Sequence, residues 1–160
     1  METENLNGVT MALAKAGLTG ISGAATTFST SACGYAIDGK AFGALANSGA
    51  ATPTADAVTG GQITLAASQA VIVVWAFDSS GNVRVIGGPV VALDLQSNFV
   101  LAPSFGPVAL DTYCPFAYTL HKADGTLSGK FTFGSSNWNT TGLTHIVQDL
   151  IALPPRPQSS

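Results

Sequence analysis

The chain has 160 residues, 46% of them apolar, which is enough for one domain whose core needs neither a disulfide nor a metal. Only 9% of the residues are Asp, Glu, Lys or Arg and the net charge is −3, whereas about 25% of a typical soluble domain is charged. The six basic residues are scattered, which argues against nucleic-acid binding, and no apolar run is long enough to span a membrane. A surface with so little charge favours association, so we expect copies or partners to cover much of it.

The N-terminal segment, residues 1–23, starts with an acidic stretch where a signal peptide would be basic. We therefore expect a protein that is not secreted, in which Cys33 and Cys114 are reduced and half-buried, although one disulfide between them is arithmetically possible. Closely spaced glycines interrupt the segment. It is interpreted as an extended arm or a first edge strand, and a short helix over 9–16 is conceivable.

From residue 24 onward, short runs of β-branched and aromatic residues alternate with turn residues. Asp38-Gly39 predicts a type I′ hairpin, because both of its central residues must adopt a positive φ. Residues 43–61 contain Pro53 and glycines without any alternation, which predicts a long surface loop. The strands expected in this half of the chain cover 26–31, 35–37, 40–42 and 63–65.

The longest run of β-branched and aromatic residues is Val71–Phe77, which we expect to form the central strand. Its odd-numbered and even-numbered residues would lie on opposite faces, and both faces are apolar. Sheets or subunits must therefore cover both sides. If a second copy covers one side, Ile72, Val74 and Ala76 lie at a subunit interface. The turn over 78–82 leads into a returning strand at 83–85 and so predicts a hairpin.

In the second half of the chain, three prolines in residues 99–115 argue against a central strand there and favour an extended, packed connection or an edge strand. Strands are expected at 90–93, at 116–121, at 130–133 (pairing back on 116–121) and at 143–151. About eight to ten short strands indicate an all-β, antiparallel sandwich or barrel that is jelly-roll-like. The predicted organisation is an N-terminal arm over 1–23, a β-sandwich domain over 24–153 and a proline-rich tail over 154–160.

Few residues are candidates for catalysis. Cys114, His145 and Asp149 are the residue types of a nucleophilic triad. However, His145 and Asp149 would lie about 13 Å apart on a strand, and we expect His145 on a polar outer face. No acid–base pair is clustered, so the sequence predicts a protein that is not an enzyme.

Metal and cofactor motifs are equally scarce. His121 and His145 stand alone and neither cysteine belongs to a Cys-x-x-Cys motif, so we expect no metal and no cofactor. Turn formation accounts for Asp38, Asp78 and Asp124. A calcium site built from these turn carboxylates is the alternative.

Trp138 is the one aromatic residue that the pattern does not place in the core, because it lies in the polar loop 134–142. It is expected to cover an end of the sandwich or to contact another subunit. The alternative is that it stacks on a sugar. The sequon Asn139-Thr140-Thr141 is interpreted as a chance match, since no secretion is expected.

Several segments resemble those of small head proteins of tailed bacteriophages that act as capsid decoration (cement) proteins. These segments are YAIDGKA (35–41), ATPTADAVTG (51–60), VW (74–75), GNV (81–83), CPFAY (114–118), FTFGSSNW (131–138) and LPPRPQ (153–158). The resemblance implies a virion protein on the outer face of an icosahedral capsid, commonly a β-rich trimer that sits at three-fold positions and reinforces the shell. Its motifs carry no chemistry.

The leading hypothesis is therefore a non-catalytic capsid decoration protein, assembled in the host cytoplasm, whose partners are its own copies in a homotrimer and the major capsid protein. Capsid contacts are expected on the arm and on the 43–61 loop, and the tail is expected to be shared between copies. The residues predicted to lie at interfaces are Leu6, Val9, Leu13, Pro53, Trp138, Pro154, Pro155, Arg156 and Pro157. The alternative is a jelly-roll carbohydrate-binding or host-attachment module with Trp138 in its site.

Overall fold

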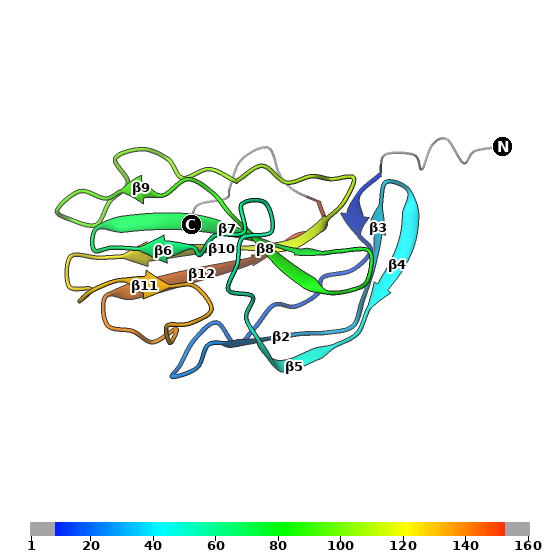
Figure 1. The fold of residues 1–160 in the computed structure, drawn as a ribbon, viewed down its shortest axis with the longest axis horizontal. Helices are drawn as coiled ribbons and strands as arrows, with labels where there is room; N and C mark the ends of the chain where they lie inside the picture. Colours follow the sequence, from blue (N-terminus) through cyan, green and yellow to red (C-terminus); the bar gives the residue numbers. More distant parts are fainter. Residues whose placement is uncertain (1–8, 153–160) are drawn as a thin grey trace.

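A computed structural model describes residues 9–152 of the chain. These residues form an all-β protein without a helix, and every pair of strands in it is antiparallel (Figure 1). The strands are β1 (Met11–Ala12), β2 (Thr27–Thr30), β3 (Cys33–Ile37), β4 (Lys40–Ala44), β5 (Asn47–Ala51), β6 (Thr64–Leu65), β7 (Gln69–Phe77), β8 (Val83–Gly87), β9 (Val91–Ala92), β10 (Cys114–Ala123), β11 (Phe131–Thr132) and β12 (Leu143–Asp149).

The largest sheet has the strand order β12-β10-β7-β8, and β9 also pairs with β7. Strand β7 contains the predicted central run, and every residue from Ala70 to Phe77 is fully buried. β-branched and aromatic side chains pack well on a pleated surface that is covered on both faces. The central strand and the hairpin that links it to β8 are therefore confirmed.

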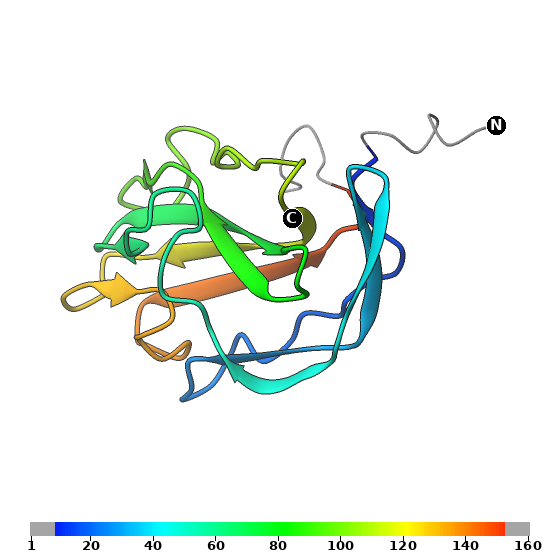
Figure 2. The same cartoon turned by 45° about the vertical axis from the view of Figure 1, so that its right-hand side comes forward.

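The two faces of β7 belong to two separate cores. Val73, Trp75 and Phe77 pack in the larger core, which is covered by a second layer of strands from the first third of the chain. Figures 1 and 2 show this layer as blue and cyan segments that curve around the green-to-orange sheet. It consists of the sheet β1-β3-β4 and the pair β2-β5.

The smaller core lies on the opposite face of β7 and contains Ile72, Val74 and Ala76. The connection between β8 and β10 covers this face with partly buried side chains such as Phe99 and Phe105. A single copy of the chain thus covers both faces of the central strand. These three residues do not lie at a subunit interface, which was one reading of the sequence.

The N-terminal residues that the structure describes are part of the fold and not an extended arm. Strand β1 pairs with β3, and Ala16, Leu18 and Ile21 are buried in the larger core. Because β1 lies at the edge of its sheet, the interpretation as a first edge strand is confirmed and the conceivable helix over 9–16 is wrong. The β-sandwich therefore begins before residue 24.

Two predicted loops are confirmed only in part, and one predicted pairing is wrong. The expected 43–61 loop contains β5, which pairs with the Thr-rich β2 although its own residues have low β propensity. The proline-containing connection extends only to Tyr113, since Pro115 belongs to β10, where a bulge precedes the pairing with β12. Strand β11 pairs with β6 and not with β10, because both edges of β10 are occupied by β7 and β12.

The Asp38-Gly39 hairpin between β3 and β4 is confirmed, with φ values of 49° and 80° at the two turn residues. Neither cysteine is bridged, and both are buried. Burial raises the pKa of the Cys33 thiol and raises the pKa of the Cys114 thiol to about 12. Both side chains are therefore neutral thiols at pH 7.

Candidate functional site

The largest polar feature in the interior is a chain of hydrogen bonds across the big sheet, which we call the histidine chain. Its members, in order, are Trp75, Thr119, His121, His145 and Trp138. Trp75 Nε1 donates to Thr119 Oγ1 at 3.0 Å, and Thr119 Oγ1 lies 2.6 Å from His121 Nε2. The two Nδ1 atoms of His121 and His145 are 2.6 Å apart, and His145 Nε2 lies 2.7 Å from the carbonyl oxygen of Trp138.

The hydrogen-bonding groups at the two ends determine every proton position in this chain. The carbonyl of Trp138 can only accept, so His145 carries its proton on Nε2. Neutral His145 then accepts at Nδ1, which places the His121 proton on Nδ1 and leaves His121 Nε2 free to accept from the Thr119 hydroxyl. Thr119 in turn accepts from the indole of Trp75, which can only donate. All donors and acceptors are satisfied when both histidines are neutral.

Burial favours this neutral state. His121 is fully buried, and burial, with a further contribution from the charge of His145, holds its pKa well below the usual value. Burial also lowers the pKa of His145, although the hydrogen bond to Trp138 opposes this shift. Aromatic rings surround the pair: Trp138 stacks on His121 at 5.8 Å between ring centroids, and Phe133 meets His121 edge-on at 5.3 Å.

The predictions for the two histidines are therefore wrong. His145 points inward from β12 and not onto a polar outer face, and His121 and His145 are neighbours and not isolated residues. Sequence reasoning missed the pair because it depends on the register between β10 and β12, in which the two residues are directly opposite each other. The available signal was that the two histidines of the chain lie on two separate predicted strands.

Trp138 lies in the core, where 1% of its surface is exposed. Its backbone N–H donates to Ala25 O at 3.0 Å and its indole Nε1 donates to Thr27 O at 2.9 Å. The sequence pattern places Trp138 outside the core, and this prediction is wrong. Its buried ring is not available to a sugar or to another subunit. The ring instead joins the loop 134–142 to strand β2.

The residues considered as a triad do not come together. His145 lies opposite His121, near the end of β10 that is remote from Cys114, about 23 Å away by the rise per residue. Asp149 Oδ1 accepts a hydrogen bond from Leu18 N at 3.1 Å. Among residues 9–152, no three His, Cys, Asp or Glu side chains are grouped so that they could hold a metal ion.

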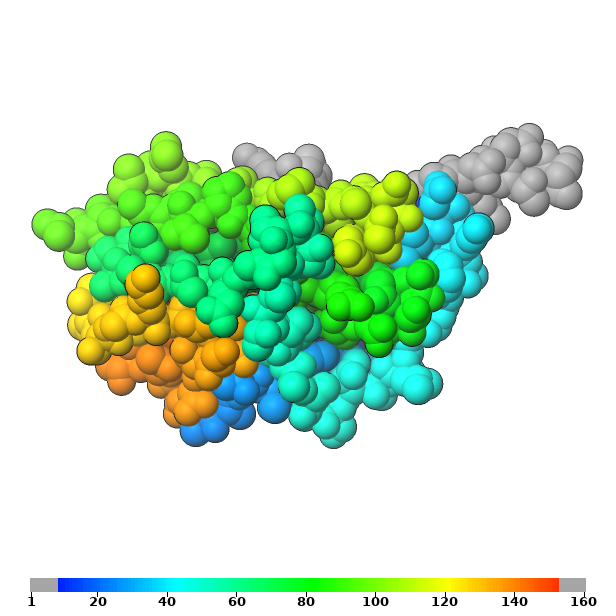
Figure 3. Space-filling model, viewed as in Figure 1, coloured from blue at the N-terminus to red at the C-terminus, as the bar shows by residue number. Residues whose placement is uncertain are grey.

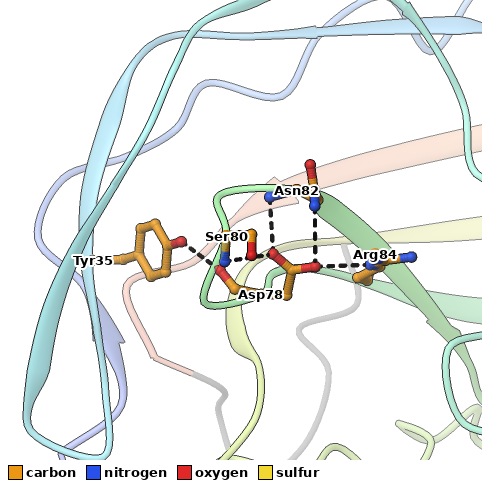
Figure 4. Close-up of polar contacts among 5 residues, drawn as sticks. All are labelled: Tyr35, Asp78, Ser80, Asn82 and Arg84. Carbon is orange, nitrogen blue, oxygen red and sulfur yellow. Dashed lines mark hydrogen bonds and ion pairs between the residues drawn. The ribbon is translucent and has the colours of Figure 1, made fainter.

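The turn carboxylates bind backbone amides and one arginine (Figure 4). Asp78 Oδ1 accepts from Ser80 N at 2.9 Å and from Asn82 N at 3.0 Å, while Oδ2 accepts from Arg84 Nε at 3.0 Å. Burial raises the pKa of Asp78, but the Arg84 and backbone hydrogen bonds outweigh it, and the pKa is lowered. The hydroxyl of Tyr35 donates to the Asp78 carbonyl and so ties this turn to β3. The structural interpretation is confirmed for Asp78, and Asp124, which accepts from Thr126 N, follows the same pattern.

Two surface cavities of about 260 Å³ each lie among the described residues. In one of them Asp56 is already saturated: it accepts from Val58 N, Thr59 N and Gly87 N, and thereby holds the 56–61 turn on β8. The other cavity lies between two hairpins and is bordered by Asp38, Lys40, Phe42, Asp111 and other residues. Its border also includes the hydroxyl side chains of Ser79 and Thr112, and Thr112 Oγ1 donates to Asp111 Oδ1 at 3.2 Å.

Exposed apolar side chains are the most distinctive feature of the surface. Nine large apolar side chains among the described residues are at least 45% exposed, and seven of them fall into two groups. The β1 apolar group lies on residues 10–13 and on the two segments that are hydrogen-bonded to them, at Leu110 and Ile151. The hairpin apolar group lies on residues 90–101, which are bridged at Leu93 and Phe99. The β1 apolar group consists of Leu13, Leu110 and Ile151, and the hairpin apolar group consists of Val90, Leu95, Val100 and Leu101.

The green to yellow-green connection that bears the hairpin apolar group runs along the upper margin of the molecule in Figure 3. Leu95, at the tip of its turn, is 97% exposed. Of the nine exposed large apolar residues, the two outside these groups are Leu45, which lies between β4 and β5 and is 86% exposed, and Val58. Exposed apolar side chains that are grouped together are typical of surfaces that other molecules cover, whereas single ones such as Leu45 and Val58 are common on any soluble protein.

Of the residues predicted at interfaces, Leu13 is 61% exposed, whereas Val9 and Pro53 are half-buried. Leu6 and the tail residues Pro154, Pro155, Arg156 and Pro157 lie outside the described residues.

Comparisons with protein families, with characterised proteins and with solved structures find no match to this chain. Within residues 9–152, no helix is long and apolar enough to cross a membrane.

Proposed function

We propose that this chain is a non-catalytic structural protein of a tailed-bacteriophage virion, which decorates and stabilises the outer surface of the icosahedral capsid. Its partners would be its own copies, in a homotrimer, and the major capsid protein. The observation that carries the proposal is the exposure of large apolar side chains on a surface with very little charge. Segments such as 114–118 and 131–138 resemble those of decoration proteins, and this resemblance indicates that the assembly is a phage capsid.

The interior supports a structural role. The histidine and tryptophan side chains that catalysis or sugar binding would require point inward, where they are hydrogen-bonded within the histidine chain. The outer surface instead presents Leu13, Leu45 and Leu95, which are 61%, 86% and 97% exposed. Leaving such side chains in water forfeits about 1.5–3 kcal/mol each relative to burial, so an assembly that covers them is stabilised.

We assign the capsid contacts to the β1 apolar group together with Leu45. Leu13 belongs to the predicted N-terminal segment and Leu45 to the predicted 43–61 loop, and both lie on the second layer of strands, outside the large sheet. In this proposal the sandwich is jelly-roll-like, and the proline-rich tail over 154–160 extends along a neighbouring copy. Proline lowers the entropy that such a tail loses when it is held in place.

The test is the occupancy of the protein on purified capsids, measured by quantitative mass spectrometry after mixing with undecorated particles. The double variant Leu13→Ser with Leu45→Ser removes two exposed side chains, so it should keep its circular dichroism spectrum but bind far fewer sites per particle. Val58→Ser is the matched control and should bind fully, because this 50% exposed residue lies in the part of the 43–61 segment that is held on β8 and not on the second layer of strands. Full occupancy by the double variant, or no binding by the unmodified protein, contradicts the proposal.

The carbohydrate-binding alternative would require a ring on which a sugar can stack. Its candidate, Trp138, is buried and uses its indole N–H to bind Thr27 O. No other observation favours glycan binding as a second function.

A further inference from the structure

We propose that the histidine chain is an acid-sensitive latch. While His121 and His145 are both neutral, it holds the loop 134–142 and its Trp138 on strand β2. When a proton enters the pair, the latch opens and the loop leaves the core before the sheet itself unfolds.

The geometry of the pair makes it intolerant of protons. A first proton on His145 converts its Nδ1 from acceptor to donor, so the His121 proton must move from Nδ1 to Nε2 to keep the 2.6 Å contact between the two Nδ1 atoms. Nε2 of His121 then donates to Thr119 Oγ1, and the Thr119 hydroxyl hydrogen loses its acceptor inside the core. A buried donor without a partner is costly. A second proton sets two N–H groups against each other at the same contact, and the pair must separate.

No neighbouring charge compensates for the added proton. Strands β2, β6, β7 and β11 contain no charged residue, and the same holds for the loop 134–142. On β10 the one charged side chain is Lys122, which lies on the other face, 5.1 Å from the centre of the Phe99 ring. On β12 it is Asp149, whose carboxylate accepts from Leu18 N. Between β10 and β11, the carboxylate of Asp124 accepts from Thr126 and Lys130 is exposed. A positive charge on the pair therefore meets aromatic rings, the Thr119 hydroxyl and the Trp138 carbonyl, but no carboxylate that is bonded to either histidine.

The loop is the element that yields first. Its sequence is polar except for Trp138, so this one side chain anchors it. At its two ends the loop is bonded to Thr132, which donates its N–H to Ser136 Oγ, and to Asp124, which donates its N–H to Gly142 O. Its middle is held on β2 and β12 by the bonds from Trp138 to Ala25 and Thr27, from Asn139 N to Gly23 O at 3.0 Å, and from His145 Nε2 to Trp138 O. In contrast, β7 and β10 are paired on both edges. His145, the half-buried member of the pair, reaches water once the loop moves away.

The sign of the pH dependence follows from the lowered pKa of both histidines. The open state, with the ordinary pKa of about 6.5, binds more protons than the closed state, so the latch is strongest above pH 6.5 and weakens as the pH falls. The carboxylates of Asp78, Asp94 and Asp124 have lowered pKa values and contribute only at lower pH. Between about pH 6.5 and 5, the opening constant should rise up to tenfold per pH unit for each histidine.

Nuclear magnetic resonance of the intact protein tests the latch. At pH 7.5, imidazole ¹⁵N shifts should show both histidines neutral, His121 protonated on Nδ1 and His145 on Nε2. The opening constant then comes from hydrogen exchange of the Trp138 indole and amide, corrected for the intrinsic effect of pH, at pH 7.5, 6.5, 5.8 and 5.0. Protection at Trp138 should fall steeply below pH 6.5 while the amides of β7 stay protected.

A single variant, His145→Gln, and a double variant, His121→Gln combined with His145→Gln, distinguish opening of the latch from a general loss of stability in acid. Glutamine can donate to Trp138 O but takes up no proton, so the single variant should lose about half of the pH dependence and the double variant nearly all of it. The inference is overturned if the tautomers are reversed or if Trp138 and β7 lose protection together. An equally steep pH dependence in His145→Gln also overturns it. The wild-type measurements decide the matter even where the double variant does not fold.

Discussion

At the scale of single residues, the protein combines a surface of low charge with the fully hydrogen-bonded histidine chain inside its core. Thr119 links the two halves of the histidine chain, because its oxygen accepts a hydrogen bond from Trp75 Nε1 and its hydroxyl donates one to His121 Nε2. Buried polar networks of this kind are stabilising only while every member has its partner. Because Thr119 gives Trp75 and His121 a hydrogen-bonding partner, the two histidines and two tryptophans can be buried in one core.

Thr119→Val keeps the shape of the side chain but removes its oxygen. The Trp75 indole and His121 Nε2 then lose their partners inside the core, so we expect the free energy of unfolding to fall by roughly 2–4 kcal/mol. Urea denaturation at pH 7.5 measures the change. Thr144→Val on the exposed face of β12 is the control and should shift the free energy by less than about 0.5 kcal/mol. Equal effects of the two substitutions would contradict the assignment.

At the scale of elements, the connection between β8 and β10 forms the cover of the smaller core. It approaches β8 so closely that a Cβ on Gly106 would lie 2.4 Å from Gly87 O, and one on Gly88 would lie 2.2 Å from Ser104 O. Only glycine allows the two backbones this contact. The close approach seals Ile72, Val74 and Ala76 from water without a second copy.

Gly106→Ala should therefore lift this connection from the sheet. We expect a loss of about 1–3 kcal/mol in the free energy of unfolding, typical of an overpacked site, together with faster hydrogen exchange at the amide of Gly88, which donates to Ile72 O. Gly43→Ala on β4 is the matched control, because nothing lies within 4 Å of its added Cβ. An unchanged exchange rate at Gly88 in the Gly106 variant would show that the contact is not tight.

The elements also show how far sequence reasoning reaches. Strand β7 was predictable because its own β-branched and aromatic residues determine it, and the Asp38-Gly39 turn carries its geometry in two residues. Strand β5 was not, since its residues have low β propensity and only the neighbouring β2 makes them a strand. The histidine pair was missed for the same reason: a contact between β10 and β12 depends on their register, which neither segment contains alone.

At the scale of the whole molecule, the two apolar groups lie on different parts of the fold. The β1 apolar group gathers around the first edge strand and includes Leu110 from the end of the connection between β8 and β10, while the hairpin apolar group lies at the start of that connection, on residues 90–101. One group can therefore face the capsid while the other faces a neighbouring copy. For the proposed homotrimer, we expect a ring of copies to close through the hairpin apolar group.

Leu95→Ser combined with Leu101→Ser should weaken self-association at least tenfold, because it removes two side chains that are 97% and 71% exposed and lie within this group. Sedimentation equilibrium of the purified protein measures the dissociation constant, and Leu45→Ser, outside the hairpin, serves as the control. If the double variant associates as tightly as the unmodified protein, the hairpin is not the contact between copies.

The most direct test of the central claim is a cryo-electron microscopy map of an intact virion that contains this chain. If the chain is a decoration protein, density for the β-sandwich should appear in many copies on the outside of the capsid, at three-fold and quasi-three-fold positions, with the β1 apolar group and Leu45 against the major capsid protein. A virion without such density, or one with a few copies at the tail alone, would contradict it.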